Sequence, residues 1–329
     1  MNLKRLASLF VLFALLFSMV ASASAQDGTE AHKVVLDLAH ETRHAGDFEN
    51  VPEKLEAMGY TVEVVTDEIT ADVLSDADMI LIPVPMGVSY SEAELNALET
   101  WFDSGNKAVW IAGDSDFDGA DYIPATNTIL QKLGSHIMLE NNSVEEPDEA
   151  YNDGAAYRVV ASNWNSAHPI TEGVAYETFH GPTFLYGVKD GNPVNLYTES
   201  IDNVDWIAAS SDSSVAVDAQ LTGFKTPGVE AGSNGPFVLM AVEERAGADE
   251  SSKIVVSAEA IFSSYKNMNM DGPSEKENFT IDGGTLLENT LAWMGQESEE
   301  ESSNTMLYLG IGVVVIIIIV GAAYAMMKK

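Results

Sequence analysis

Short apolar runs alternate with stretches of helical spacing over the first third of the chain. The runs KVVLDL, YTVEVV, DMILIPVP and KAVWIAG are typical of buried strands. Residues 48–58 and 91–102 have apolar positions three and four apart, and Ser91 with Glu94 forms a capping-box pattern. Apolar strands joined by helices predict an α/β fold, with a flavodoxin-like parallel sheet and helices on both faces.

The texture changes after a further predicted helix that follows Pro124. From residue 140 to residue 235 the chain has short β-type runs, many small polar residues and little helical periodicity. We interpret this stretch as a β-rich insertion or subdomain between the two parts of the α/β domain, residues 26–139 and 236–295. The runs PFVLMAVEE and KIVVSAEAIF predict a return of the parallel sheet, and TLLENTLAWMG predicts a closing helix.

The two ends of the chain predict export and a membrane anchor. Residues 1–25 have the basic start, the apolar run and the Ala23-Ser24-Ala25 site of a signal peptide. Residues 306–327 hold no charge and rise about 33 Å as a helix, enough to span a bilayer. An acidic stalk at 296–305 precedes this segment and lysines at 328–329 follow it, which predicts a single-pass type I protein with a cytoplasmic tail. An uncleaved N-terminal anchor, giving two spans, is the alternative.

Charge and cysteine content limit the possible partners. The two ends hold four of the 16 Lys and Arg residues and none of the 51 Asp and Glu residues, so residues 26–305 carry a net formal charge of −39. Nucleic acid and anionic lipid are poor partners for such a surface. The charge indicates either cation binding or a surface kept soluble by repulsion. The absence of cysteine excludes thiol catalysis and thiolate metal sites.

Ligands of open α/β sheets bind beyond the carboxyl ends of the strands, so the polar residues there are candidates for a site. The candidate residues of the pocket edge are Asp37, His40, Pro85, Gly113, Asp114 and Ser115. The segment His40-Glu41-Thr42-Arg43-His44 also matches the zinc-protease pattern. Because it directly follows a strand and no third ligand is indicated, a polar loop is the alternative.

Three alternate carboxylates suggest a cation site. Asp114, Asp116 and Asp118, followed by Gly119, reproduce the first half of a calcium loop, in which alternate carboxylates converge on the ion. The twelfth position is Ala125 instead of an acid. No other cofactor is predicted, and a solvated acidic turn is the alternative.

Other residues suggest hydrolysis, ligand stacking or glycosylation. Ser115 follows a strand as a nucleophile would, with His168 or His180 as its base, although Phe117 replaces the glycine of the usual motif. Three aromatic residues offer stacking faces for a glycan, namely Trp164, Trp206 and Tyr157. Asn141 and Asn278 fit the N-glycosylation pattern.

The order of elements resembles the class I glutamine amidotransferase-like fold, and more narrowly its non-catalytic branch, the GIFT domain. The resemblance covers about residues 33–295 and is carried by DLAHE, ITADVLSDADMILIPVP, SEAELNALETWFDSGNKAVWIAGD, HPITEGV, KIVVSAEAIFSS and TLLENTLAWM. Catalytic members carry a cysteine after the strand equivalent to KAVWIAG, where this chain has Asp114-Ser115. The resemblance therefore implies that amidotransferase activity is absent.

Known settings of GIFT domains include ABC-type transport and gliding systems, intraflagellar transport, and a single-span subunit of oligosaccharyltransferase. The resemblance implies an accessory or scaffold subunit of a membrane complex, in glycosylation or transport, with integral membrane subunits as partners. The alternatives are a surface hydrolase and a receptor for a glycan or small solute, with calcium as a candidate cofactor of either.

Overall fold

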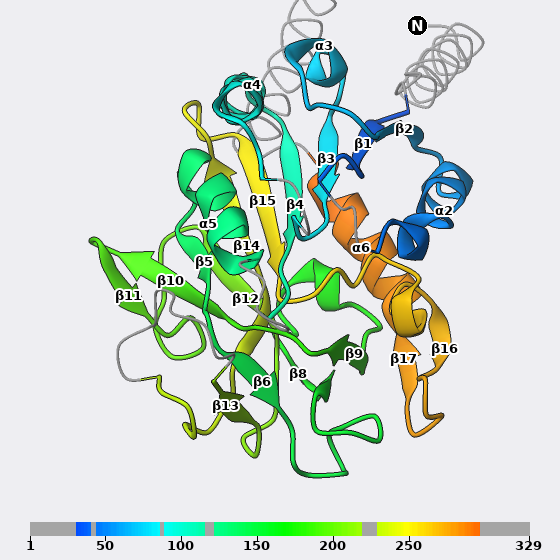
Figure 1. Ribbon diagram of the computed structural model, residues 1–329, viewed down its shortest axis with the longest axis vertical. Helices are drawn as coiled ribbons and strands as arrows, with labels where there is room; N and C mark the ends of the chain where they lie inside the picture. The colour runs from blue at the N-terminus through cyan, green and yellow to red at the C-terminus, as the bar shows by residue number, and fades with distance from the viewer. Residues whose placement is uncertain (1–30, 41–43, 86–88, 116–121, 219–228, 297–329) are drawn as a thin grey trace, which may run out of the picture. The chain divides into compact units, whose positions relative to one another are not determined.

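The computed structural model describes residues 31–40, 44–85, 89–115, 122–218 and 229–296. The chain divides into two units, residues 1–32 and 33–329, and every described helix and strand belongs to the second. Figure 1 shows these elements with their labels.

One half of the main sheet is parallel. Its strands lie in the order β2-β1-β3-β4-β15. Their bounds are β1 (Lys33–Asp37), β2 (Thr61–Val65), β3 (Met79–Ile82), β4 (Ala108–Ala112) and β15 (Ser252–Ser257). β3 and β4 are buried along their whole length, as their apolar sequences predict. All five strands end at one edge of the sheet.

The other half is antiparallel, so the predicted flavodoxin-like, wholly parallel sheet is wrong. In the described part of the chain the sheet has 11 strands, and β14 pairs antiparallel with β15, β10 and β12. The added strands are β5 (Ile137–Leu139), β8 (Asn163–Trp164), β10 (Leu185–Lys189), β11 (Asn192–Val194), β12 (Val204–Ala209) and β14 (Val238–Ala246). Only residues 247–251 join β14 to β15, too few for the crossover that parallel neighbours need.

Three two-stranded sheets lie outside the main sheet. They pair β6 (Ser143–Glu145) with β13 (Val215–Val217), β7 (Arg158–Ala161) with β9 (Glu177–His180), and β16 (Asp271–Pro273) with β17 (Thr280–Asp282). The segment 140–235 therefore supplies strands to two of the small sheets and to the main sheet.

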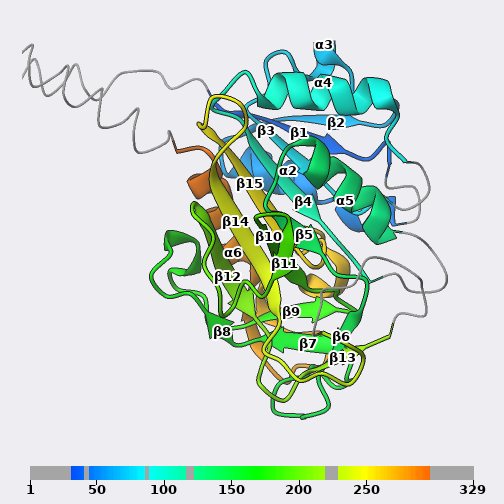
Figure 2. The ribbon, with the colours of Figure 1, turned by 90° about the vertical axis from the view of Figure 1, so that its left-hand side faces the viewer.

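Helices cover both faces of the parallel half (Figures 1 and 2). Val34 and Leu36 pack in one apolar cluster with α2 (Val51–Ala57) and α6 (Gly283–Met294). Val35 faces the opposite way and packs in a second cluster. The helices of that second cluster are α3 (Ala71–Leu74), α4 (Glu92–Phe102) and α5 (Tyr122–Lys132). Short 3-10 turns are η1 (Ala45–Phe48), η3 (Pro169–Thr171) and η4 (Tyr265–Asn267).

The ends of α4 follow the sequence signals. The Ser91 hydroxyl accepts a hydrogen bond from the backbone N–H of Glu94, whose carboxylate accepts one from the backbone N–H of Ser91. This confirms the predicted capping box. After the helix, Gly105 has a φ of +90°, a conformation that glycine adopts without strain.

The predicted membrane topology requires a correction. In the described ranges no helix has the length and apolar character that a membrane span needs. The longest of them, α6, has 12 residues, whereas a span takes about 20. The signal peptide at 1–25, the span at 306–327, the tail at 328–329 and the stalk beyond residue 296 fall outside the described residues. The finding goes against the single-pass prediction and the localisation based on it.

Candidate functional site

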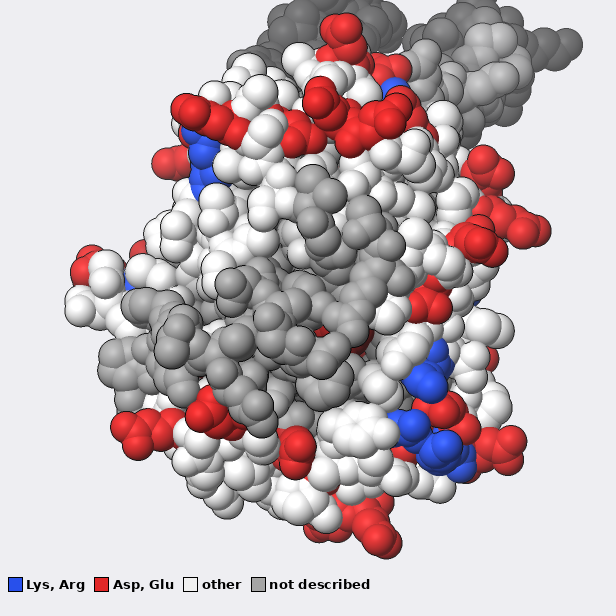
Figure 3. Space-filling model, viewed as in Figure 1, with Lys and Arg blue, Asp and Glu red and all other residues white. Residues whose placement is uncertain are grey.

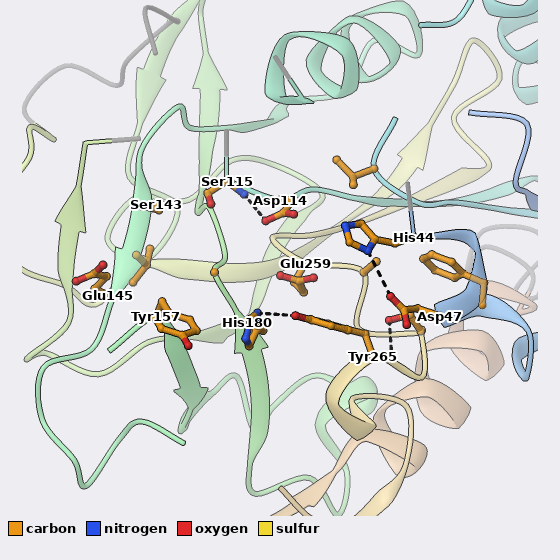
Figure 4. Close-up of a pocket in the computed structure, with 16 residues that line it drawn as sticks. His44, Asp47, Asp114, Ser115, Ser143, Glu145, Tyr157, His180, Glu259 and Tyr265 are labelled. Carbon is orange, nitrogen blue, oxygen red and sulfur yellow. Dashed lines mark hydrogen bonds and ion pairs between the residues drawn. The ribbon is translucent and has the colours of Figure 1, made fainter. Parts of the chain in front are cut away.

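A cavity of about 570 Å³ lies at the carboxyl ends of the parallel strands (Figure 4). Residues that follow β1, β3, β4 and β15 line it, and β6 and β9 contribute further residues. This edge is where open α/β sheets bind their ligands, and the volume is in the range of small-molecule sites.

Two carboxylates enter the cavity from neighbouring strands. Asp114 follows β4, and Glu259 follows β15. Glu259 is 7% exposed, and its Oε2 has no hydrogen-bond partner among the described residues. Burial raises the pKa of Glu259 well above its usual value, and the charges of Asp114 and Asp47 raise it further. The protonated form of Glu259 is therefore favoured more than it is in an exposed glutamate.

Three rings form a row on another side of the cavity: Tyr157, His180 and Tyr265 (Figure 4). The His180 ring meets Tyr157 and Tyr265 edge to face, with centroids 5.1 and 5.0 Å away. The Tyr265 hydroxyl and the His180 Nδ1 are hydrogen-bonded at 3.3 Å. Burial lowers the pKa of His180, and the charges of Arg158 and Lys266 lower it further, so the ring is neutral near pH 7.

The proposed nucleophile and its base are not brought together. Ser115 lines the cavity, but its hydroxyl makes no hydrogen bond to any histidine that the structure describes. His168 is the N-cap of η3, where its Nδ1 accepts a hydrogen bond from the backbone N–H of Ile170, and its ring lies 5.5 Å from that of Trp293. His44 and His180 line the cavity with Ser115, but among the described residues neither makes the hydrogen bond to its hydroxyl that would activate a serine.

The two histidines of the zinc-protease pattern have separate surroundings. His40 is 2% exposed, with Nδ1 2.8 Å from Asp37 and Nε2 3.2 Å from Glu94. The Tyr90 ring stacks on His40 at 3.7 Å and its hydroxyl donates to Asp37. Both ring nitrogens are therefore occupied by carboxylates. His44 lines the cavity, 3.7 Å from Asp47, while Glu41 to Arg43 lie outside the described residues.

Some of the predicted pocket-edge residues line the cavity and others do not. Asp37 and His40 belong to the buried cluster described above and do not line the cavity. Pro85 is buried and does not line it either. Gly113 lies just before Asp114, where a Cβ would stand 1.9 Å from a methyl carbon of Leu139. The sheet thus brings Asp114 and Ser115 to the cavity from this set.

The structure covers only part of the calcium prediction. Asp116 and Asp118 lie outside the described residues. Among the residues that are described, no group of three or more histidines and carboxylates is arranged to hold a metal ion.

The glycosylation and stacking candidates also differ in accessibility. Asn141 is 1% exposed, whereas Asn278 is exposed between β16 and β17. Trp164 donates from its indole nitrogen to the carbonyl of Ala175, and Trp206 packs on Tyr197. Tyr157, which is 44% exposed, is the stacking candidate that lines the cavity.

Sequence reasoning named two members of the ring row, Tyr157 and His180, but did not single out Tyr265 or the acid at the centre of the cavity. Glu259, Tyr265 and Asp47 were not among the candidates. A usable signal existed for Glu259, since it follows the run KIVVS by two residues, as Asp114 follows AVWIA. The missing information was that these two strands are neighbours.

Comparisons with known proteins give a likeness of fold. No family model matches the chain, and no curated protein matches it. Among solved structures the chain is similar to the mmIFT52 N-terminal domain, with a TM-score of 0.55 and 11% sequence identity. The likeness covers 80% of this chain and 97% of that chain. At this identity it shows the fold alone.

The likeness corrects one further expectation. This structural neighbour is named as neither an oligosaccharyltransferase nor an amidotransferase. The predicted place in oligosaccharyltransferase and glycosylation depended on a single-span topology, which the described residues do not support. That expectation is therefore withdrawn.

Proposed function

We propose that the chain is a non-catalytic binding module whose cavity takes a small ligand with a positively charged group, an ammonium or a guanidinium. The observation behind this proposal is the buried Oε2 of Glu259, which has no partner among the described residues and lines a cavity shared with Asp114 and Asp47. A buried polar atom without a partner is costly in a folded protein.

A cationic group accounts for these features in physical terms. An ammonium donates up to three hydrogen bonds, so it satisfies the Glu259 oxygen and offsets the repulsion among the three acids. Burial and the neighbouring charges raise the pKa of Glu259, so protonation of this carboxyl reduces that repulsion. Binding of the cation then favours the ionised carboxylate. Tyr157 and Tyr265 add aromatic rings, which also attract cations.

Binding without catalysis fits the other side chains of the cavity. Among the described residues the Ser115 hydroxyl has no hydrogen bond to a histidine, and the neutral His180 is hydrogen-bonded to Tyr265. The chain has no cysteine that could replace Ser115 as a nucleophile.

Titration of the purified full chain with propylamine and pentylamine tests the proposal. We expect saturable binding by calorimetry, and we expect Glu259→Gln to weaken it at least about 30-fold, since loss of one partner of a buried charge pair costs about 2–5 kcal/mol. Glu177→Gln is the matched control, because Glu177 is fully buried with a raised pKa but lies outside the cavity. Absence of saturable binding, or equal affinities in both variants, contradicts the proposal.

Calcium binding at Asp114 stays a prediction, because Asp116 and Asp118 of the predicted loop lie outside the described residues, and the described residues alone contain no group of three that could hold a metal ion. Calcium titration followed by tryptophan fluorescence tests it, with Asp114→Asn expected to lose the response. The role of accessory or scaffold subunit is independent of the cavity and stays a prediction, to be tested by co-purification.

A further inference from the structure

Three cationic side chains meet beside the cavity of a strongly acidic chain. Arg158, Lys266 and Lys276 place nitrogen atoms 3.0, 3.2 and 3.5 Å from the carboxylate of Glu275. The nearby Asp153 carboxylate already accepts hydrogen bonds from the hydroxyl of Ser274 and the backbone N–H of Lys276. Positive charge is therefore in local excess in this cluster, which we call the basic cluster. Figure 3 shows basic side chains gathered at the lower right of the molecule, while acidic ones are spread widely.

The basic cluster adjoins the row of rings that lines the cavity. The Arg158 guanidinium lies 5.5 Å from the ring centroid of Tyr157, and the Lys266 ammonium lies 5.2 Å from that of Tyr265. Both tyrosines flank His180, whose pKa is lowered by burial and then by these two cations. The cavity therefore has acids on one side, of which Glu259 is buried, and cations next to the tyrosines of its ring row.

Tyr265 lies within electrostatic reach of both charged regions. Burial raises the pKa of Tyr265 to about 12, with added contributions from the charges of Glu259, Asp47, Asp114 and Glu275. The Tyr265 ring lines the cavity and the Lys266 ammonium lies 5.2 Å from its centroid, so a molecule that contacts Glu259 and extends past Tyr265 comes close to the basic cluster.

Two local features suit the basic cluster to an anionic group. Lys266 and Asn267 have φ values of 51° and 66°, and such consecutive left-handed residues persist only where the surroundings hold them. The Nε of Arg158 is buried and has no hydrogen-bond partner among the described residues. An unused donor beside two ammonium groups matches a carboxylate, which accepts several charge-assisted hydrogen bonds.

We propose that the ligand is an amino carboxylate, with its ammonium at Glu259 and its carboxylate at the basic cluster. This inference rests on the proposed function and adds the second charged end of the ligand. Because Glu259 lines the cavity whereas the side chains of the basic cluster lie outside its lining, a molecule with separated charges fits better than an α-amino acid. An ω-amino acid of a few carbons has this form.

Pairs of ligands that differ only in the carboxyl group test the contact with the basic cluster separately from the contact with Glu259. Removal of the carboxyl group converts γ-aminobutyrate into propylamine and ε-aminocaproate into pentylamine. We expect one of the two amino acids to bind the full chain at least about tenfold more tightly than its amine, because charge-assisted hydrogen bonds contribute about 1.5–3 kcal/mol. The preference should decrease with added salt.

Variants assign this preference to the basic cluster. We expect Lys266→Gln to bring the ratio of affinities close to one without weakening amine binding, and Lys266→Arg to keep the preference. Lys189→Gln, at a lysine that contacts the carbonyl of Ser200 outside the cluster, is the control. Thermal unfolding of each variant checks that it is folded.

The outcomes separate the two proposals. Amine binding with no gain from the carboxylate overturns the amino carboxylate but leaves the cation site intact. A preference that survives Lys266→Gln also overturns the assignment to the cluster. Absence of amine and amino acid binding overturns both proposals. Binding of a hexaglutamate peptide that depends on Lys266, without a preference for amino acids, overturns the small ligand in favour of an acidic protein segment.

Discussion

Asp114 and Glu259 occupy equivalent positions after two neighbouring strands. Ala112 of β4 pairs with Ser257 of β15, and each acid follows its own member of this pair by two residues. Parallel strands end at a common edge, so this register brings the two carboxyl groups to one cavity. Their proximity, together with burial, accounts for the raised pKa of Glu259. The register of one strand pair thus creates the main chemical feature of the site.

The affinity for an alkylamine should increase with pH. The raised pKa of Glu259 favours its neutral form, and a cation binds the ionised form more tightly. The amine itself stays charged up to about pH 10. We expect pentylamine affinity to rise as the pH increases above the usual glutamate value of about 4.3, with release of a proton on binding. Calorimetry in two buffers of different ionisation enthalpy measures that proton, and an affinity independent of pH would contradict the role of Glu259.

The free energy of unfolding of the protein without ligand should decrease as the pH rises. Burial raises the pKa of Glu177 and of Glu259 above their unfolded values, so the folded state binds more protons near neutral pH. Stability is therefore present below the unfolded pKa and declines as the pH rises toward the folded values, by about 1.4 kcal/mol per unit for each group. Urea unfolding across this range measures the slope. Glu177→Gln should flatten it, and an unchanged slope would show that Glu177 titrates normally.

The sequence predicted features formed by residues close together in the chain better than it predicted which strands lie next to each other in the sheet. The capping box at Ser91 and Glu94 was predicted because all of its partners lie within four residues. Asp114 was predicted because it follows an apolar strand. Glu259 was missed because its partner strand is more than a hundred residues away in the chain, and an apolar run does not reveal its neighbours.

The same limit explains the error in the sheet. β14 is buried within the sheet, so it is as apolar as a parallel strand and was interpreted as one. The better signal was the short connection at residues 247–251, which permits only an antiparallel pair. The zinc-protease pattern was similarly ambiguous, since its spacing does not show that Asp37 and Glu94 occupy both nitrogens of His40.

His40 should stabilise the protein most at mildly acidic pH. Burial alone would lower the pKa of His40, but the hydrogen bond and charge of Asp37 and the charge of Glu94 outweigh it and raise the pKa. Its contribution is therefore complete below the unfolded pKa of about 6.5 and is lost as the pH rises through the folded value. We expect His40→Gln to cost about 3–5 kcal/mol below about pH 6, as for a broken buried pair, and less at alkaline pH.

Urea unfolding at several pH values measures this loss. His136→Gln is the control, because His136 also contacts a carboxylate, at 2.6 Å from Glu243, but its side chain is 53% exposed. Because the His136 side chain is half exposed, we expect this pair to contribute less than a fully buried one. If both substitutions cost the same at every pH, the buried cluster has no special role.

Gly113 should be required for packing against β5 and not for the backbone conformation of the turn. A Cβ at this position would stand 1.9 Å from Leu139 Cδ2, and no such atom lies within 4 Å of a Cβ built at Gly46. We expect Gly113→Ala to destabilise the protein by about 1–3 kcal/mol through overpacking, and Gly46→Ala to have little effect. Leu139→Val removes the clashing methyl group, so the double variant should lose less stability than the two single variants together. A coupling free energy of about 0.5–3 kcal/mol from urea unfolding of the four proteins confirms direct contact, whereas strictly additive losses place the strain elsewhere.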